Sequence, residues 1–188
     1  TVKPEIAPPL LPDSLRGLYS WTAPDLKIPA GDGSIAGKLL DDAAKQMAAK
    51  QNDLALSSLD QIKLKESASP AADLVALASA VVYNAMGLSS NALGQLEGFL
   101  KDHANHPQAD YAKYVLGVSL LRIGKPDSAA KVLGPLPIAT RNSLWTEANR
   151  QSALGEALRL SGKPSEALAA LRLAFQAETD VKSRRSIA

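Results

Sequence analysis

The stretch Leu116–Leu133, LGVSLLRIGKPDSAAKVL, determines our prediction of the fold, because a second stretch repeats its pattern. The second copy is Leu154–Leu171, LGEALRLSGKPSEALAAL, with the same small, large and turn residues at the same offsets. In both copies apolar residues recur every three or four positions, as on amphipathic helices, and Gly-Lys-Pro interrupts them. Glycine is common just after a helix and proline in the first turn of the next one. Each copy therefore predicts two helices joined by a short turn.

Two earlier and weaker copies extend the repeat toward the N-terminus. The anchoring alanines lie 37, 37 and 38 residues apart, at Ala55, Ala92, Ala129 and Ala167. A regular period of this size predicts stacked helical hairpins. We expect helices at residues 36–50, 53–65, 71–86, 89–103, 109–123, 126–134, 142–161 and 164–177. No strand pattern competes with this all-α assignment.

The repeat resembles the tetratricopeptide repeat (TPR) family. A small residue, a large one three positions later, a glycine four further on, and then alanine with a large residue four later is typical of that family. Gly117 and Gly155 would let the first helix of a hairpin approach the second, and Ala129 and Ala167 would do so from the other side. The resemblance covers roughly residues 35–177. It implies an α-solenoid, a right-handed superhelix of about four TPR-like hairpins.

The composition excludes several classes of protein. The chain of 188 residues has 21 basic and 19 acidic side chains, a net charge of +2 without the basic patch typical of nucleic-acid binding. The absence of cysteine excludes thiol catalysis, thiolate metal sites and disulfides. The longest strongly apolar stretch, Leu74–Val82, is shorter than the ~20 residues of a membrane span. We therefore expect no nucleic-acid partner and no transmembrane segment.

The N-terminal region differs in composition from the rest of the chain. Six of the twelve prolines precede residue 30, which favours extended backbone. Apolar residues among them predict that Leu15–Trp21 packs on the first or second hairpin while Thr1–Pro9 stays mobile; the alternative is a tether throughout. Ser34 is expected to cap the first helix. The predicted division is a proline-rich arm or tether at residues 1–34, a TPR-like helical domain at 35–178, and the start of a truncated further helix or cap at 179–188.

Two patterns that resemble cofactor or metal motifs fail on their context. Gly31-Asp32-Gly33 followed by Ala36 formally satisfies the glycine fingerprint of dinucleotide binding, but without a βαβ unit we interpret it as a turn. His103 and His106 with Asp102 form an incomplete set of metal ligands, and we interpret them as part of a solvated loop. Since no catalytic grouping has a defensible spacing, we predict no catalytic, cofactor-binding or metal-binding residue and no enzyme activity.

A solenoid creates a concave groove lined by the first helix of each hairpin, and this groove is the candidate binding surface. The second hairpin would contribute Leu77, Val81 and Asn84. In the third and fourth hairpins the predicted partner-binding residues are Tyr111, Tyr114, Val118, Arg122, Asn149, Ser152, Glu156 and Arg159. Tyrosine and arginine are frequent hot-spot residues at interfaces. The alternative is that Tyr114 or Val118 packs against the proline-rich arm or a neighbouring hairpin.

A more specific resemblance rests on Leu96–Leu133, with its helix ending in Phe-Leu-Lys-Asp, a bridge containing Pro107, and Ala-x-Tyr in the next helix. It is similar to repeats of bacterial envelope lipoproteins of the outer-membrane assembly and Tol-Pal-associated type. The later repeats resemble the N-terminal repeat domain of penicillin-binding-protein activators. These resemblances imply a periplasmic, non-catalytic protein-protein interaction scaffold that binds a peptide or domain of an envelope protein. They also imply an outer-membrane lipid anchor outside this chain and a larger lipoprotein as options. The alternative is a helical regulatory domain of a peptidoglycan-acting enzyme.

Overall fold

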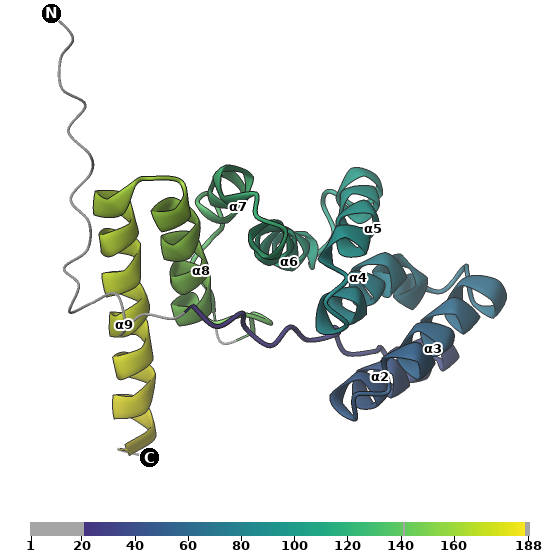
Figure 1. The fold of residues 1–188 in the computed structure, drawn as a ribbon. Coiled ribbons are helices and arrows are strands. Elements are labelled where there is room, and N and C mark those ends of the chain that lie inside the picture. Colours follow the sequence, from purple (N-terminus) through teal and green to yellow (C-terminus); the bar gives the residue numbers. More distant parts are fainter. Residues whose placement is uncertain (1–20, 141, 187–188) are drawn as a thin grey trace, which may run out of the picture.

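The computed structural model describes residues 21–140 and 142–186, and in this part of the chain all regular secondary structure is helical (Figure 1). The all-α prediction is therefore confirmed. The elements are α2 (Ile35–Ala48), α3 (Asn52–Lys65), the 3-10 helix η1 (Pro70–Leu74), α4 (Val75–Ala85), α5 (Ser89–Asp102), α6 (Ala109–Arg122), α7 (Pro126–Leu133), α8 (Glu147–Leu160) and α9 (Pro164–Ser186).

Consecutive helices pack as pairs, which follow one another along the molecule (Figure 1). The pairs are α2 with α3, α4 with α5, α6 with α7, and α8 with α9. Neighbouring pairs contact each other through α3 and α4, α5 and α6, and α7 and α8. The first helices also contact one another in sequence, from α2 through α4 and α6 to α8. These four helices form a continuous surface, which we call the first-helix face.

Small residues allow the two helices of a pair to approach closely. A Cβ atom added at Gly117 in α6 would lie 2.5 Å from the side chain of Leu133 in α7. A Cβ atom at Gly155 in α8 would lie 2.7 Å from Leu171 in α9. Ala129 has no exposed surface. The small residues of the repeat therefore lie at helix contacts, as the sequence pattern predicted.

The turns within the last three pairs also follow the prediction. Gly87, Gly124 and Gly162 have φ angles of 77°, 73° and 73°, which an L-residue rarely adopts. Pro126 opens α7 and Pro164 opens α9, where a missing amide proton costs nothing. In the turns before α7 and α9 the glycine ends one helix and the proline begins the next, whereas α5 begins at Ser89.

Two helices begin later than the periodicity suggested. α8 starts at Glu147 because Thr146 caps it, accepting a hydrogen bond from the Asn149 amide at 3.1 Å. The helix expected over residues 71–86 opens as η1, and regular α-helix starts only at Val75. Before α8 the apolar residues Leu144 and Trp145 lie in a non-helical loop, whereas before α4 the apolar residues lie in the 3-10 helix.

α9 is longer than predicted. We expected the helix to end near residue 177 and a separate helix or cap to start at 179. The helix instead continues to Ser186, over 23 residues. No glycine or proline follows Pro164 within it, so nothing in the sequence interrupts the helix.

A compact turn connects the arm to α2. Ser34 Oγ accepts a hydrogen bond from the Gly37 amide at 2.9 Å, so the predicted helix cap is confirmed. The Gly31 amide donates to Asp41 Oδ1 at 2.8 Å. A Cβ at Gly31 would lie 2.1 Å from the Gly37 carbonyl oxygen, so only glycine allows this approach. Residues 1–20 lie outside the described part, and with them most of the predictions for Thr1–Pro9 and Leu15–Trp21.

Candidate functional site

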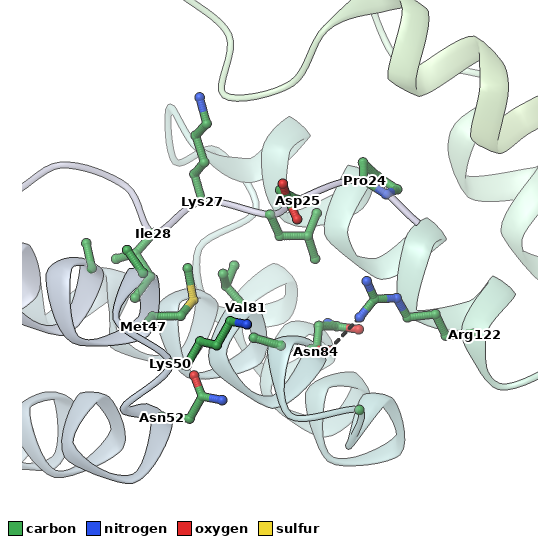
Figure 2. Close-up of a pocket in the computed structure, with 15 residues that line it drawn as sticks. Pro24, Asp25, Lys27, Ile28, Met47, Lys50, Asn52, Val81, Asn84 and Arg122 are labelled. Carbon is green, nitrogen blue, oxygen red and sulfur yellow. Dashed lines mark hydrogen bonds between the residues drawn. The ribbon is translucent and has the colours of Figure 1, made fainter. Parts of the chain in front are cut away.

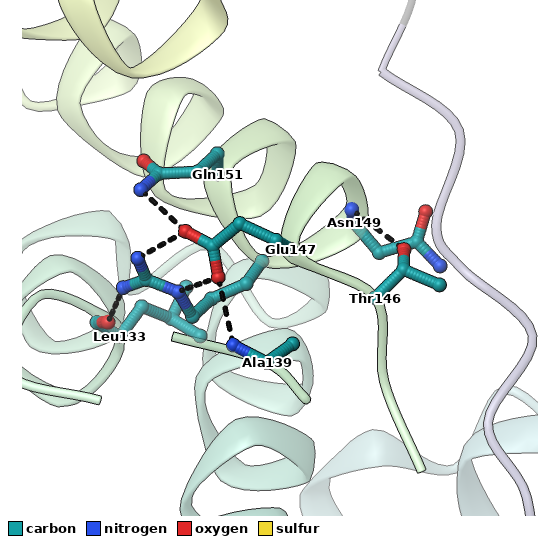
Figure 3. Close-up of polar contacts among 7 residues, drawn as sticks. Leu133, Ala139, Thr146, Glu147, Asn149 and Gln151 are labelled. Atoms are coloured by element: carbon teal, nitrogen blue, oxygen red, sulfur yellow. Dashed lines mark hydrogen bonds and ion pairs between the residues drawn. The ribbon is translucent and has the colours of Figure 1, made fainter. Parts of the chain in front are cut away.

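The described part of the arm, residues 21–30, crosses the first-helix face as extended chain. It begins beside the N-terminal end of α8 and passes α6 and α4 before joining α2 (Figures 1 and 3). Leu26 and Ile28 are buried, with 9% and 6% of their surface exposed. Asp25, which precedes them, and Lys27, which lies between them, are exposed. This alternation is that of an extended segment with one face on a surface. The arm therefore covers part of the predicted groove.

Tyr111 of α6 holds the backbone of the arm at one residue. Its hydroxyl accepts a hydrogen bond from the Lys27 amide at 2.7 Å and donates one to the Lys27 carbonyl oxygen at 2.6 Å. Burial raises the pKa of Tyr111, although its hydrogen bond to Lys27 opposes the shift, so the hydroxyl keeps the proton that it donates. Because both bonds go to backbone atoms, they recognise extended chain and not a particular side chain.

Three aromatic rings stack next to this contact. Tyr111, Tyr114 and Trp145 have ring centroids 5.8 to 6.2 Å apart and interplanar angles of 7° to 24°. Trp145 comes from the loop between α7 and α8, far from the tyrosines in sequence. The Tyr114 hydroxyl and Trp145 Nε1 are buried without a hydrogen-bond partner among the described residues. Packing, not polar pairing, therefore holds these rings, which fix Tyr111 opposite the arm.

A polar network connects α4 and α6 beneath the arm. The Asn84 amide group donates to the Ala80 carbonyl at 2.9 Å and to Ser119 Oγ at 2.8 Å, and Asn84 Oδ1 accepts from Ser89 Oγ at 2.9 Å. Arg122 Nη1 donates to the Asn84 carbonyl at 2.5 Å. The network positions the Arg122 guanidinium across the C-terminal end of α4, where helix carbonyls favour a cation.

A pocket of about 920 Å³ lies between the arm and the ends of the first helices (Figure 2). The arm residues Pro24–Ile28 form one side, and Lys50, Asn52 and Arg122 line it together with apolar side chains. Figure 2 shows the Lys50 and Arg122 side chains extending into this space, while the Lys27 side chain points away from it. Desolvation lowers the pKa of Arg122, and the charges of Asp25 and Tyr114 oppose that shift. Asp25 of the arm thus lies within electrostatic reach of Arg122.

The third-hairpin residues predicted to bind a partner lie on the first-helix face, but three are not open to solvent. Tyr111, Tyr114 and Val118 are buried, with at most 1% of their surface exposed. The arm backbone covers Tyr111, and the Trp145 ring stacks on Tyr114. The burial of Tyr114 and Val118 agrees with the alternative that they pack within the protein, and partner binding at these positions stays a prediction. Arg122, the fourth predicted residue of this hairpin, is exposed and lines the pocket.

The fourth-hairpin residues lie on α8. Asn149 and Arg159 are exposed, Ser152 is half-buried, and Glu156 is buried. Arg159 donates to both carboxylate oxygens of Glu156, at 2.8 and 2.7 Å. Glu156 is thus already engaged within its own helix, whereas Asn149 lies close to the start of the arm (Figure 3).

A second polar cluster fixes the loop that carries Trp145 (Figure 3). Arg150 is 5% exposed and donates to both oxygens of Glu147, at 3.0 and 2.5 Å, and to the Leu133 carbonyl at 3.2 Å. Glu147 also accepts from the Ala139 amide at 3.1 Å and from Gln151 at 2.8 Å. These bonds join the end of α7, the loop and α8, and so hold the loop in place beside α6.

The two histidines lie at the junction of α5 and α6, apart from the first-helix face. His103 Nδ1 lies 3.9 Å from Asp73 Oδ2, and His106 Nδ1 accepts from the Gln108 amide at 3.0 Å. Both rings pack against Phe99. No group of three or more possible metal ligands occurs in the part of the chain that the structure describes. Both histidines are half-buried between α5 and α6, whereas Ala104, Asn105 and Pro107 beside them are exposed, as expected for a solvated loop.

Comparison of the chain with protein-family models, curated proteins and solved structures finds no match. Within residues 21–140 and 142–186, no helix combines the length and apolar character needed to cross a bilayer. The first-helix face, with the arm and the pocket on it, is the candidate functional site.

Sequence reasoning missed the arm segment Leu26–Ile28 and the ring of Trp145. The alternation Leu26-Lys27-Ile28 was a signal for an extended segment with one buried face. Trp145 gave no comparable signal, because its partners are more than thirty residues away in sequence.

Proposed function

We propose that this protein is a non-catalytic protein-protein interaction scaffold of the bacterial cell envelope, folded as a TPR-like right-handed superhelix. It binds an extended segment of a partner on the first-helix face. The observation that carries the proposal is the paired hydrogen bond between the Tyr111 hydroxyl and the Lys27 backbone. A surface that holds its own arm in this way has the groups needed to hold another extended chain.

Recognition of an extended peptide needs polar groups for its backbone and recesses for alternate side chains. The first-helix face supplies both. Tyr111 pairs with the backbone, and Leu26 and Ile28 enter the same buried cluster as the helices. The polar side chains around them, such as Asn84 and Ser119, are hydrogen-bonded to one another, which suits a binding surface more than a reaction centre.

The location in the envelope is the part of the proposal that rests on sequence resemblance alone. Leu96–Leu133 is similar to repeats of envelope lipoproteins, and a proline-rich N-terminal region would suit a tether from a membrane anchor. Fractionation of cells that express the natural gene tests it. Recovery with the periplasmic or outer-membrane fraction supports the location, and recovery in the cytosol contradicts it.

Site-specific photo-crosslinking in the native cell tests binding at the first-helix face. A photoreactive phenylalanine replaces Ala85, at the pocket, or Asn149, near the start of the arm; both residues are exposed. Matched controls carry it at the exposed residues Glu97 in α5 and Lys131 in α7. We expect the same partner segment to crosslink from the first two positions and to bind again when purified. A partner that crosslinks only from the two control positions would refute the proposal.

A further inference from the structure

The arm does not fill the surface on which it lies. It inserts Leu26 and Ile28 into the apolar cluster, yet a pocket of about 920 Å³ remains along its inner side. A ligand that complements a site well leaves little such space, because protein interiors pack closely. Larger or longer side chains at the inward positions of the arm would have room to enter this pocket.

The charges around the pocket are also incompletely matched. Lys50 and Arg122 extend into it, while Asp25 of the arm is the only carboxylate among the lining residues (Figure 2). Arg122 has Asp25 within electrostatic reach. Lys50 has no ion-pair partner among the residues that the structure describes. The lining of the pocket therefore has more positive than negative side chains, because Lys50 and Arg122 extend into it and Asp25 is the one carboxylate that lines it.

Resting on the function proposed above, we propose that the arm is an internal competitor for the first-helix face and that the partner is an acidic extended segment. The partner repeats the pattern of Asp25 followed by apolar residues at alternate positions. It differs from the arm in carrying a further carboxylate, at one of the two inward positions, that pairs with Lys50. An ammonium group in a partly apolar pocket forms strong, charge-assisted hydrogen bonds with a carboxylate.

The arm has an advantage that a partner must overcome. As part of the same chain it is present at a local concentration in the millimolar range, which is typical of short flexible connections. The apparent affinity of a free peptide falls in proportion to the fraction of molecules whose site is open. If the arm covers the face in nine molecules out of ten, loosening it should raise the affinity for a free peptide about tenfold.

The first experiment tests competition, with the full chain throughout. The variant Leu26→Ser/Ile28→Ser removes the two apolar contacts of the arm, and Thr22→Ser is the matched control, since Thr22 is exposed. The probe is a fluorescent peptide with the sequence of residues 21–30, WTAPDLKIPA. We expect it to bind the loosened variant about tenfold more tightly than the wild type and the control. Equal affinities for all three chains would overturn the role of the arm.

The second experiment tests the chemistry of the partner. Peptides with Glu or Gln at the position of Leu26, or at that of Ile28, are compared on the loosened variant. At one position at least, the Glu peptide should bind roughly fivefold or more tightly than its Gln counterpart, an advantage that declines with salt. The advantage should disappear when the chain also carries Lys50→Met. No preference for Glu at either position would overturn the acidic partner.

A measurement on the wild-type chain remains decisive if the loosened variant does not fold. The Lys27 amide donates to Tyr111, so its hydrogen exchange reports whether the arm is in place. With the arm in place in nine molecules out of ten, a saturating Glu peptide should accelerate this exchange up to about tenfold, whereas binding without any acceleration overturns the competition. The two proposals fail in different ways. Crosslinking from Ala85 and Asn149 without a preference for Glu removes the inference and leaves the scaffold function intact.

Discussion

The close contact between α6 and α7 predicts opposite effects for the same substitution at two helical glycines. Gly117 and Gly94 both lie inside 14-residue helices, where replacing glycine by alanine gains about 1 kcal/mol of helix propensity. At Gly94 no atom lies within 4 Å of the new Cβ, so this gain is unopposed. At Gly117 the new Cβ would lie 2.5 Å from both Cγ and Cδ2 of Leu133 and 3.1 Å from its Cδ1. Leu133 is fully buried, so neighbouring atoms surround it and oppose its displacement.

Overpacking of this kind costs about 1–3 kcal/mol, so the free energy of unfolding should differ by that amount between Gly94→Ala and Gly117→Ala. Urea unfolding followed by circular dichroism at 222 nm measures it. With a slope of about 1–3 kcal/mol per molar, the two midpoints should differ on the order of 1 M, with Gly94→Ala above the wild type. Equal stabilisation by both substitutions would refute the assigned contact between α6 and α7.

Three further predictions concern the buried polar and aromatic groups. Arg150→Met leaves the Leu133 carbonyl and the Glu147 carboxylate without their main donor, and should lower the free energy of unfolding by about 2–3 kcal/mol in a urea titration. Desolvation raises the pKa of Glu147, but hydrogen bonds from Arg150, Gln151 and the Ala139 amide lower it by a larger amount. The pKa of Glu147 therefore lies below the ordinary 4.5. The stability that this ionised group contributes is present above pH 4.5 and is lost as the pH falls through the folded-state pKa; the wild type should therefore lose more stability than Arg150→Met in acid unfolding curves. Burial raises the pKa of Tyr111 and Tyr114 above the ordinary value of about 10, so stability should fall as the pH rises past 10. In an alkaline titration their absorbance change at 295 nm should coincide with the loss of helicity, and Tyr111→Phe and Tyr114→Phe should each remove part of it; ionisation well before unfolding would contradict their burial.

The helix pairs were predictable because their requirements are local and repeat. Gly117 and Ala129 lie at one helix contact, and Gly124 must end a helix with a positive φ angle, so each constraint acts on a fixed sequence offset. Two close copies and two weaker ones, 37, 37 and 38 residues apart, then identify the pairs without knowledge of distant contacts. The predicted helix boundaries were wrong where a single capping residue determines the start of the helix. Thr146 ends the loop before α8, although apolar residues continue on its N-terminal side.

The candidate site was only half predictable. The spacing correctly placed Tyr111 and Arg122 on the first-helix face, because that depends on the period of α6. It gave no indication that the Lys27 backbone would occupy the Tyr111 hydroxyl, since a hydrogen bond to backbone atoms leaves no trace in residue type. The sequence did not predict the path of the arm across the helices either. An extended segment without a repeat does not define which of several helices it crosses.

The position of the arm explains how a surface can be covered and still be available. Leu26 and Ile28 belong to the main buried cluster, and burying one such side chain completely is worth roughly 1.5–3 kcal/mol. Ordering the extended backbone costs about 1–2 kcal/mol for each residue, although Pro24 and Pro29 reduce that cost on either side of the segment. The burial term and the ordering term therefore oppose each other, so the bound arm is less stable than its buried side chains alone would make it. A partner that merely copied the arm would gain the same contacts and would lose to it, because free association costs additional entropy. A partner of the kind proposed must therefore gain something that the arm lacks, and the pocket lined by Lys50 offers it.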